Sequence, residues 1–125
     1  VRAGWPLEIA ASVSEEAGAT APFDMVLAVN LVHISPWEVT RGLLTGAAEL
    51  LKPAGTLMLY GPYSERGQHN SNGNREFDAD LRARNPSWGI RNLEDVAQQG
   101  AAAGLSRLRV IEMPANNRTL LFNAP

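Results

Sequence analysis

The side chains best suited to chemistry in this sequence lie at the ends of its apolar segments. Asn30 and His33 follow an apolar run that begins at Phe23, and the sequence Tyr-Gly-Pro-Tyr at 60–63 follows a second run. His33 is the group in this set whose ordinary pKa suits a general base near neutral pH. A histidine at a strand end also often orients a loop or caps a helix through a hydrogen bond. Both roles for His33 therefore stay open at this point.

Apolar patterning predicts the elements that must position these groups. Residues 23–31 are almost wholly apolar, which favours a parallel strand covered on both faces. Ser35 and Pro36 begin a capping-box pattern that predicts a helix start, and Lys-Pro-Ala-Gly at 52–55 ends that helix. Residues 56–60 then form a second apolar strand. A strand, a helix and a strand in this order predict a βαβ unit with parallel strands.

The second half of the sequence predicts two further helices and a closing pair of strands. Residues 63–74 are polar and rich in Gly, Ser and Asn, which is typical of a surface loop. Because only a short turn at 114–117 joins the last two strands, those strands should be antiparallel. The expected elements are helices over 76–84 and 92–104 and strands over 107–113 and 119–122.

Composition limits the class of protein. The 125 residues, 45% hydrophobic and 19% charged, are typical of one folded domain with a single core. Because there is no Cys and there are only two His, we expect no disulfide, thiol nucleophile or metal site. A net charge of −2 without a basic stripe argues against nucleic-acid binding, and Arg82, Arg84 and Arg91 are interpreted as solvated. Without a leader-like or bilayer-long apolar run, the sequence predicts a cytoplasmic protein without membrane contact.

Several short motifs, taken in order, resemble a known superfamily. Phe-Asp-Met-Val at 23–26, Asn30 and His33 at the strand end, Leu-Lys-Pro-Ala-Gly at 51–55 and the terminal strand pair resemble the C-terminal part of class I S-adenosylmethionine-dependent methyltransferases. The usual form of the turn in that superfamily is Leu-Lys-Pro-Gly-Gly, from which Ala54 departs. Four longer stretches resemble an uncharacterised methyltransferase-like family, a domain of unknown function: 30–37, 60–63, 77–89 and 114–117.

This resemblance implies an α/β fold, namely the C-terminal half of a Rossmann-like methyltransferase sheet. Its features would be parallel strands, a terminal antiparallel hairpin and helices on both faces. Residues 1–125 would form a partial methyltransferase-like domain, with a leading loop and short helix over 1–22 and the remaining elements over 23–125. The glycine-rich turn that holds the cofactor would lie upstream of Val1. We therefore expect this chain alone to be inactive and to lack most cofactor contacts.

The resemblance also implies S-adenosylmethionine as cofactor and a small molecule of unknown identity as methyl acceptor. Ligands of open α/β sheets bind beyond the carboxyl ends of the strands, so the segments 30–34, 60–63 and 113–117 should share one edge. The predicted cofactor-binding residues are Asn30 and Leu31, the predicted catalytic residues are His33, Tyr60 and Tyr63, and the predicted substrate-binding residues are Trp37, Gly61, Pro62, Asn72 and Asn116.

Plain structural roles compete with these functional ones. Trp37 suits core packing as well as stacking on a substrate. Asn116 suits a turn as well as a ligand contact, and residues 67–72 suit an ordinary solvated loop as well as a lid. For the whole protein, a non-catalytic binding or scaffold domain and a nicotinamide-dependent oxidoreductase remain alternatives to a methyltransferase.

The strand at 23–31 carries a further expectation about partners. In the implied sheet it would be flanked by a strand from upstream, so its apolar edge would otherwise carry unpaired backbone groups. We expect either a second copy, giving a homodimer, or an upstream segment to cover this edge.

Overall fold

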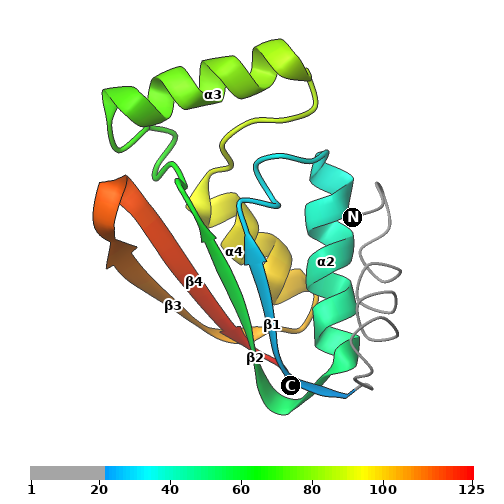
Figure 1. Cartoon of the computed structure of the whole chain (residues 1–125). Helices are drawn as coiled ribbons and strands as arrows, with labels where there is room; N and C mark the ends of the chain where they lie inside the picture. The colour runs from blue at the N-terminus through cyan, green and yellow to red at the C-terminus, as the bar shows by residue number, and fades with distance from the viewer. Residues whose placement is uncertain (1–21) are drawn as a thin grey trace.

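The computed structural model describes residues 22–125, so the leading loop and short helix expected over 1–22 lie almost wholly outside the described residues. Figure 1 shows the chain order of the elements, in which the strands alternate with helices and end in a hairpin. The elements are β1 (Phe23–Val29), α2 (Trp37–Leu50), β2 (Leu51–Gly61), α3 (Asn72–Arg84), α4 (Leu93–Ala102), β3 (Ser106–Met113), the 3-10 turn η1 (Pro114–Asn116) and β4 (Asn117–Asn123).

The four strands form one sheet in the order β1-β2-β4-β3. β1 pairs with β2 in parallel, whereas β4 is antiparallel to both β2 and β3. The α/β class, the parallel pair and the terminal antiparallel hairpin are therefore confirmed. β3 runs in the same direction as β2, because each is antiparallel to β4. The carboxyl ends of β1, β2 and β3 consequently share one edge of the sheet, as expected (Figure 1).

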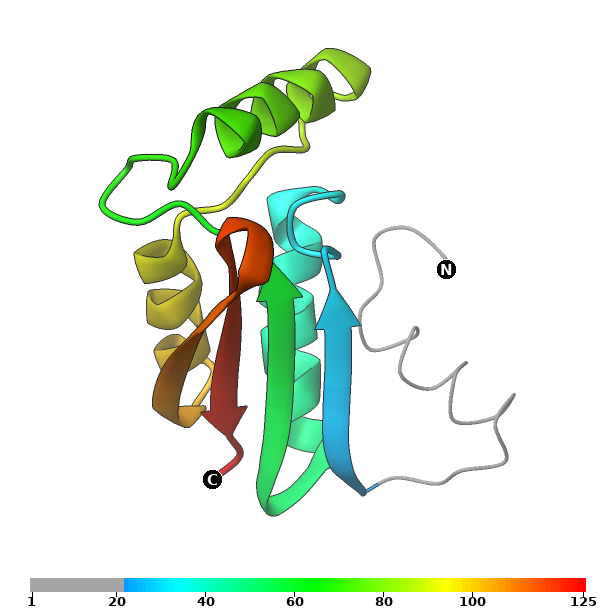
Figure 2. The ribbon, with the colours of Figure 1, turned by 60° about the vertical axis from the view of Figure 1, so that its left-hand side comes forward.

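Helices α2 and α4 lie together on one face of this sheet (Figure 2). Leu57 and Leu59 of β2 point toward them and are fully buried in the core. On the opposite face of β1, Met25, Leu27 and Val29 are each more than half exposed. No helix of residues 22–125 covers that face, so a helix layer there remains a prediction. α3 lies instead across the carboxyl edge of the sheet (Figures 1 and 2).

The start of α2 differs from the capping-box prediction, which was wrong. Pro36 is the N-cap residue, and no side chain caps the helix. The hydroxyl of Ser35 donates instead to the carbonyl oxygen of Leu31, one turn back along the chain. The physical reason is that this bond turns the Ser35 side chain back toward the loop after β1, and no helix N–H group donates to it. The loop that carries His33 gains a fixed shape from this bond.

Two element boundaries also lie earlier than predicted. α3 begins at Asn72 instead of residue 76, because the hydroxyl of Ser71 accepts the N–H of Asn74 over 3.0 Å and caps the helix. β2 begins at Leu51, which pairs with Phe23 before a break in register. Asn72 therefore lies at a helix start and not within the polar loop. α4 ends before Gly104, whose φ of +91° suits the expected glycine after a helix.

Candidate functional site

The carboxyl ends of β1 and β2 lie side by side, which brings Asn30 next to Tyr60. The backbone N–H of Asn30 donates to the carbonyl oxygen of Tyr60 over 2.8 Å. Asn30 has a φ of 58°, in the left-handed region that Asn tolerates better than most residues. Its carbonyl oxygen accepts the N–H groups of His33 and Ile34, both at 3.1 Å. The turn at Asn30 therefore folds the following loop back at the strand end.

His33 lies at the centre of this strand end and is completely buried. Its ring contacts Tyr63 edge to face, with ring centroids 4.5 Å apart. Nδ1 accepts the backbone N–H of Arg91 over 3.0 Å. Burial, followed by the nearby positive charge of Arg91, lowers the pKa of His33 from 6.5 to about 3. The imidazole is therefore neutral near pH 7, and because Nδ1 is an acceptor, its proton is on Nε2.

Two buried polar atoms meet at Gly61 without a hydrogen-bond partner. They are Nε2 of His33, a donor in this tautomer, and Oδ1 of Asn30, an acceptor. A Cβ atom built on Gly61 would lie 2.5 Å from His33 Nε2 and 3.2 Å from Asn30 Oδ1. Only glycine therefore leaves room for both groups here. A chemical group that both accepts and donates, such as a hydroxyl, has the hydrogen-bonding capacity that these two atoms lack.

The Tyr-Gly-Pro-Tyr segment divides between the core and the other face of the sheet. Tyr63 is only 1% exposed and belongs to the hydrophobic core. Burial raises the pKa of its phenol, so the group stays protonated and neutral. Gly61 and Pro62 are also buried, whereas Tyr60 is partly exposed. Tyr60 alternates with the buried Leu59, so its side chain faces away from α2 and α4.

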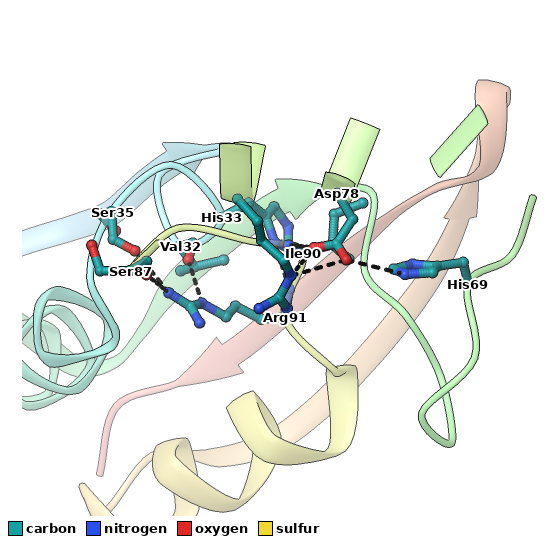
Figure 3. Close-up of polar contacts among 9 residues, drawn as sticks. Val32, His33, Ser35, His69, Asp78, Ser87, Ile90 and Arg91 are labelled. Atoms are coloured by element: carbon teal, nitrogen blue, oxygen red, sulfur yellow. Dashed lines mark hydrogen bonds and ion pairs between the residues drawn. The ribbon is translucent and has the colours of Figure 1, made fainter. Parts of the chain in front are cut away.

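A second group of polar side chains extends from His33 toward α3 (Figure 3). The carboxylate of Asp78 accepts the N–H of Ile90 over 2.8 Å and the Nε–H of Arg82 over 3.0 Å. His69 Nε2 lies 3.4 Å from the same carboxylate. Asp78 therefore joins α3 to the loop before α4 and to the loop after β2.

A polar pocket of about 540 Å³ opens beside this group, between α3 and α4. His69, Asp78 and Arg91 line it together with Trp37. The ring of Trp37 packs against the core, and the Arg91 guanidinium lies 5.5 Å from its centroid. The packing role of Trp37 is therefore observed, and substrate stacking by this ring remains a prediction.

The remaining predicted site residues lie around these two groups. Leu31 is partly buried and packs against the core. Asn72 and Asn116 are both exposed. The side-chain amide of Asn74, in the same turn of α3 as Asn72, donates to the carbonyl oxygen of Asn116 over 3.2 Å. The start of α3 therefore contacts the β3–β4 turn. The structure brings Asn30, His33, Gly61 and Tyr63 together, whereas Trp37 lies in the polar pocket.

Arg91 is a polar residue of this site that the sequence did not identify. It was expected to be solvated together with Arg82 and Arg84, and for Arg91 this expectation was wrong. Its side chain is half-buried and makes three hydrogen bonds to backbone carbonyl oxygens. Nothing local distinguishes Arg91 from its neighbours, since its partners lie up to 59 residues away in the chain.

Within residues 22–125, no three His, Cys, Asp or Glu side chains gather as metal ligands. No helix in this part of the chain is long and apolar enough to cross a membrane.

Comparison with protein families gives one match over almost the whole chain. Residues 2–124 match a family described as "Protein of unknown function (DUF938)". The match agrees with the resemblance to a family of unknown function, and the description itself names no activity.

Solved structures with a similar fold are methyltransferases. Human N-acetylserotonin methyltransferase in complex with SAM has a TM-score of 0.73 at 12% identity, covering 81% of this chain and 29% of that one. An O-methyltransferase family protein from Burkholderia thailandensis has a TM-score of 0.70 at 17% identity, with 81% and 30% covered. A methyltransferase of calicheamicin biosynthesis with SAH bound has a TM-score of 0.70 at 16% identity, with 85% and 32% covered. The chain thus shares the methyltransferase fold and spans about a third of these proteins.

Proposed function

This chain belongs to the DUF938 family, and we propose that the protein containing it is an S-adenosylmethionine-dependent methyltransferase that acts on a small molecule. One observation carries the proposal. The sheet of this chain has the order β1-β2-β4-β3, with β4 antiparallel to its two neighbours. The chain shares its fold with methyltransferases crystallised with SAM or SAH. Because the identities are low and a fold does not fix chemistry, the activity is a proposal and not a consequence of the fold.

The strand end offers groups that fit the cofactor implied by this fold. Asn30 Oδ1 is a buried acceptor without a partner at the carboxyl end of β1, which fits a donor group of a bound molecule. Leu31 offers partly buried apolar surface next to it. S-adenosylmethionine, when bound, supplies an electrophilic methyl group on a sulfonium. In the proposal, Asn30 and Leu31 contact this cofactor.

His33 then acts as a hydrogen-bond donor toward the methyl acceptor. A neutral imidazole with an occupied Nδ1 and a proton on Nε2 has no free lone pair, which argues against a general base in this state. Nε2–H instead orients an oxygen or nitrogen of the acceptor, so the chain contributes mainly by positioning. Tyr63 holds the ring of His33 from the side. Contacts of Tyr60, Gly61, Pro62, Trp37, Asn72 and Asn116 with a substrate remain part of this proposal.

The test uses the full-length protein that contains this chain. S-adenosylmethionine and S-adenosylhomocysteine should raise its melting temperature, and a nicotinamide dinucleotide should not. Asn30→Ala should weaken cofactor binding in calorimetry about three- to tenfold, the value of one hydrogen bond. Gln98→Ala, an exposed change in the polar pocket, is the control and should leave this affinity unchanged.

The alternatives predict different results in the same experiment. A thermal shift with the dinucleotide alone would support an oxidoreductase. If none of the three compounds raises the melting temperature, a non-catalytic binding or scaffold domain becomes the better description.

A further inference from the structure

The Arg91 guanidinium joins two loops that are distant in sequence. Its Nε donates to the carbonyl oxygen of Val32 over 3.0 Å, and one terminal nitrogen donates to those of Ser35 over 2.8 Å and Ser87 over 2.7 Å. Figure 3 shows the side chain between these partners. Val32 and Ser35 flank His33 in the loop after β1. The guanidinium therefore holds the loop that carries His33 on both sides of the imidazole.

The backbone at Gly89 and at Arg91 is hydrogen-bonded to the same loop. The N–H of Gly89 donates to the carbonyl oxygen of His33 over 2.9 Å, and the N–H of Arg91 donates to His33 Nδ1 over 3.0 Å. Between them, the N–H of Ile90 donates to Asp78 over 2.8 Å. Residues 89–91 are thus fixed to His33 and to α3 at the same time. A small displacement of this segment would remove the donor that occupies Nδ1.

The chemistry of this position requires arginine in particular. The planar guanidinium presents donors in several directions, and here it reaches three carbonyl oxygens while it lies 5.5 Å from the Trp37 ring centroid. A lysine keeps the charge but offers one compact ammonium, which does not reproduce this planar arrangement. Burial and the neighbouring Arg82 lower the pKa of Arg91, while Asp78 and Glu38 counteract them. The two carboxylates therefore offset part of the cost of placing this cation here.

We propose that Arg91 is a positioning residue that fixes the tautomer of His33. Its side chain holds the loop after β1 so that its own backbone N–H occupies Nδ1, which leaves the proton on Nε2 beside Gly61 and Asn30. The tautomer is a property of the free protein. Its use to orient a methyl acceptor rests on the proposed function.

Nitrogen NMR of the histidine side chains in the full-length protein tests this proposal directly. The wild type should show a protonated Nε2 and an unprotonated Nδ1 for His33 at neutral pH. In Arg91→Lys, the His33 signals should shift or broaden toward a mixture of tautomers. The control is Arg84→Lys, at an exposed arginine that pairs with Asp80 on α3, and it should leave the His33 signals unchanged.

Each remaining outcome is decisive. A proton on Nδ1 in the wild type overturns the proposal without any variant, even where Arg91→Lys does not fold. Wild-type signals in a folded Arg91→Lys protein overturn it as well, because the side chain would then not be needed. A failure of the proposed function is distinguishable from these results, since it appears as an absent thermal shift with S-adenosylmethionine while the tautomer result holds.

Discussion

Burial lowers the pKa of His33 and keeps the imidazole neutral near pH 7, and the same burial predicts a pH dependence of stability. The pKa of His33 is about 3 in the folded chain and 6.5 ordinarily, so between these values the unfolded state binds the extra proton. The free energy of unfolding should therefore decrease as the pH falls below 6.5, by about 1 kcal/mol per pH unit.

Urea unfolding between pH 7 and pH 5 measures this slope before most carboxylates titrate. In His33→Asn the slope over this window should be much smaller, even though the variant is less stable at pH 7. Retention of the wild-type slope in His33→Asn would mean that other groups cause the acid sensitivity. His69→Gln is the control, because its ring is partly exposed and lies outside the strand end.

Gly61 gives a second prediction at the scale of a single residue. A methyl group there would lie 2.5 Å from Nε2 of the buried His33 ring, so the ring or the strand would have to shift. Gly61→Ala should therefore destabilise the protein by about 2 kcal/mol, within the range for overpacked cores. Gly73→Ala is the matched control, since its nearest neighbour would lie 3.8 Å away, and it should be neutral or slightly stabilising. Chemical denaturation measures the free energy of unfolding of both variants. If Gly61→Ala is as stable as Gly73→Ala, the close approach of His33 to Gly61 is refuted.

At the scale of elements, the first part of β2, where its register with β1 breaks, contains a strained residue. Ala54 has a φ of 62°, a left-handed conformation that costs a non-glycine residue about 1 kcal/mol. This explains why the resembling superfamily usually has glycine at this position of the turn. Ala54→Gly should raise the free energy of unfolding by about 1 kcal/mol. The same exchange at the exposed Ala79 within α3 should instead lower it by a similar amount, and a loss of stability in Ala54→Gly would contradict the strain.

At the scale of the whole molecule, β1 is an edge strand with an apolar outer face. Within residues 22–125 it pairs only with β2, and Met25, Leu27 and Val29 are 51%, 57% and 55% exposed. The unpaired backbone of an edge strand promotes pairing with another strand, and an exposed apolar face promotes association with another apolar surface. We propose that either an upstream segment or a second copy covers it in the full-length protein.

Leu27→Lys tests this coverage. A charge placed under a covering segment should cost about 2 kcal/mol or more, whereas at a solvated position it would be nearly neutral. Val110→Lys, at a partly exposed strand residue on the α4 side, is the control. Denaturation of the two full-length variants gives the cost, and sedimentation separates the two coverings, because only a homodimer dissociates in Leu27→Lys. If Leu27→Lys is as stable as the wild type, neither an upstream segment nor a second copy covers this face of β1.

The sequence by itself determined the local elements and their order. Apolar runs predicted the strands, and the short turn at 114–117 predicted the antiparallel hairpin, and both were confirmed. The predicted connections were confirmed less closely, since residues 52–55 lie within β2 and α3 begins inside the predicted loop. The shared edge of the strand ends followed as well, because parallel strands end on the same side. These features depend on periodicity and turn chemistry within a few residues of each other, which is the range over which a sequence pattern is readable.

Only the tertiary structure decided which groups meet at that edge and in which chemical state. The contact between Arg91 and His33 spans 58 residues, so no local pattern distinguishes Arg91 from a solvated arginine. Ser35 was predicted to cap a helix and bonds to a loop carbonyl instead, because the folded loop offers the closer partner. The buried Tyr63, the neutral His33 and its Nε2 proton likewise follow from desolvation and hydrogen bonds that exist only once the chain has packed.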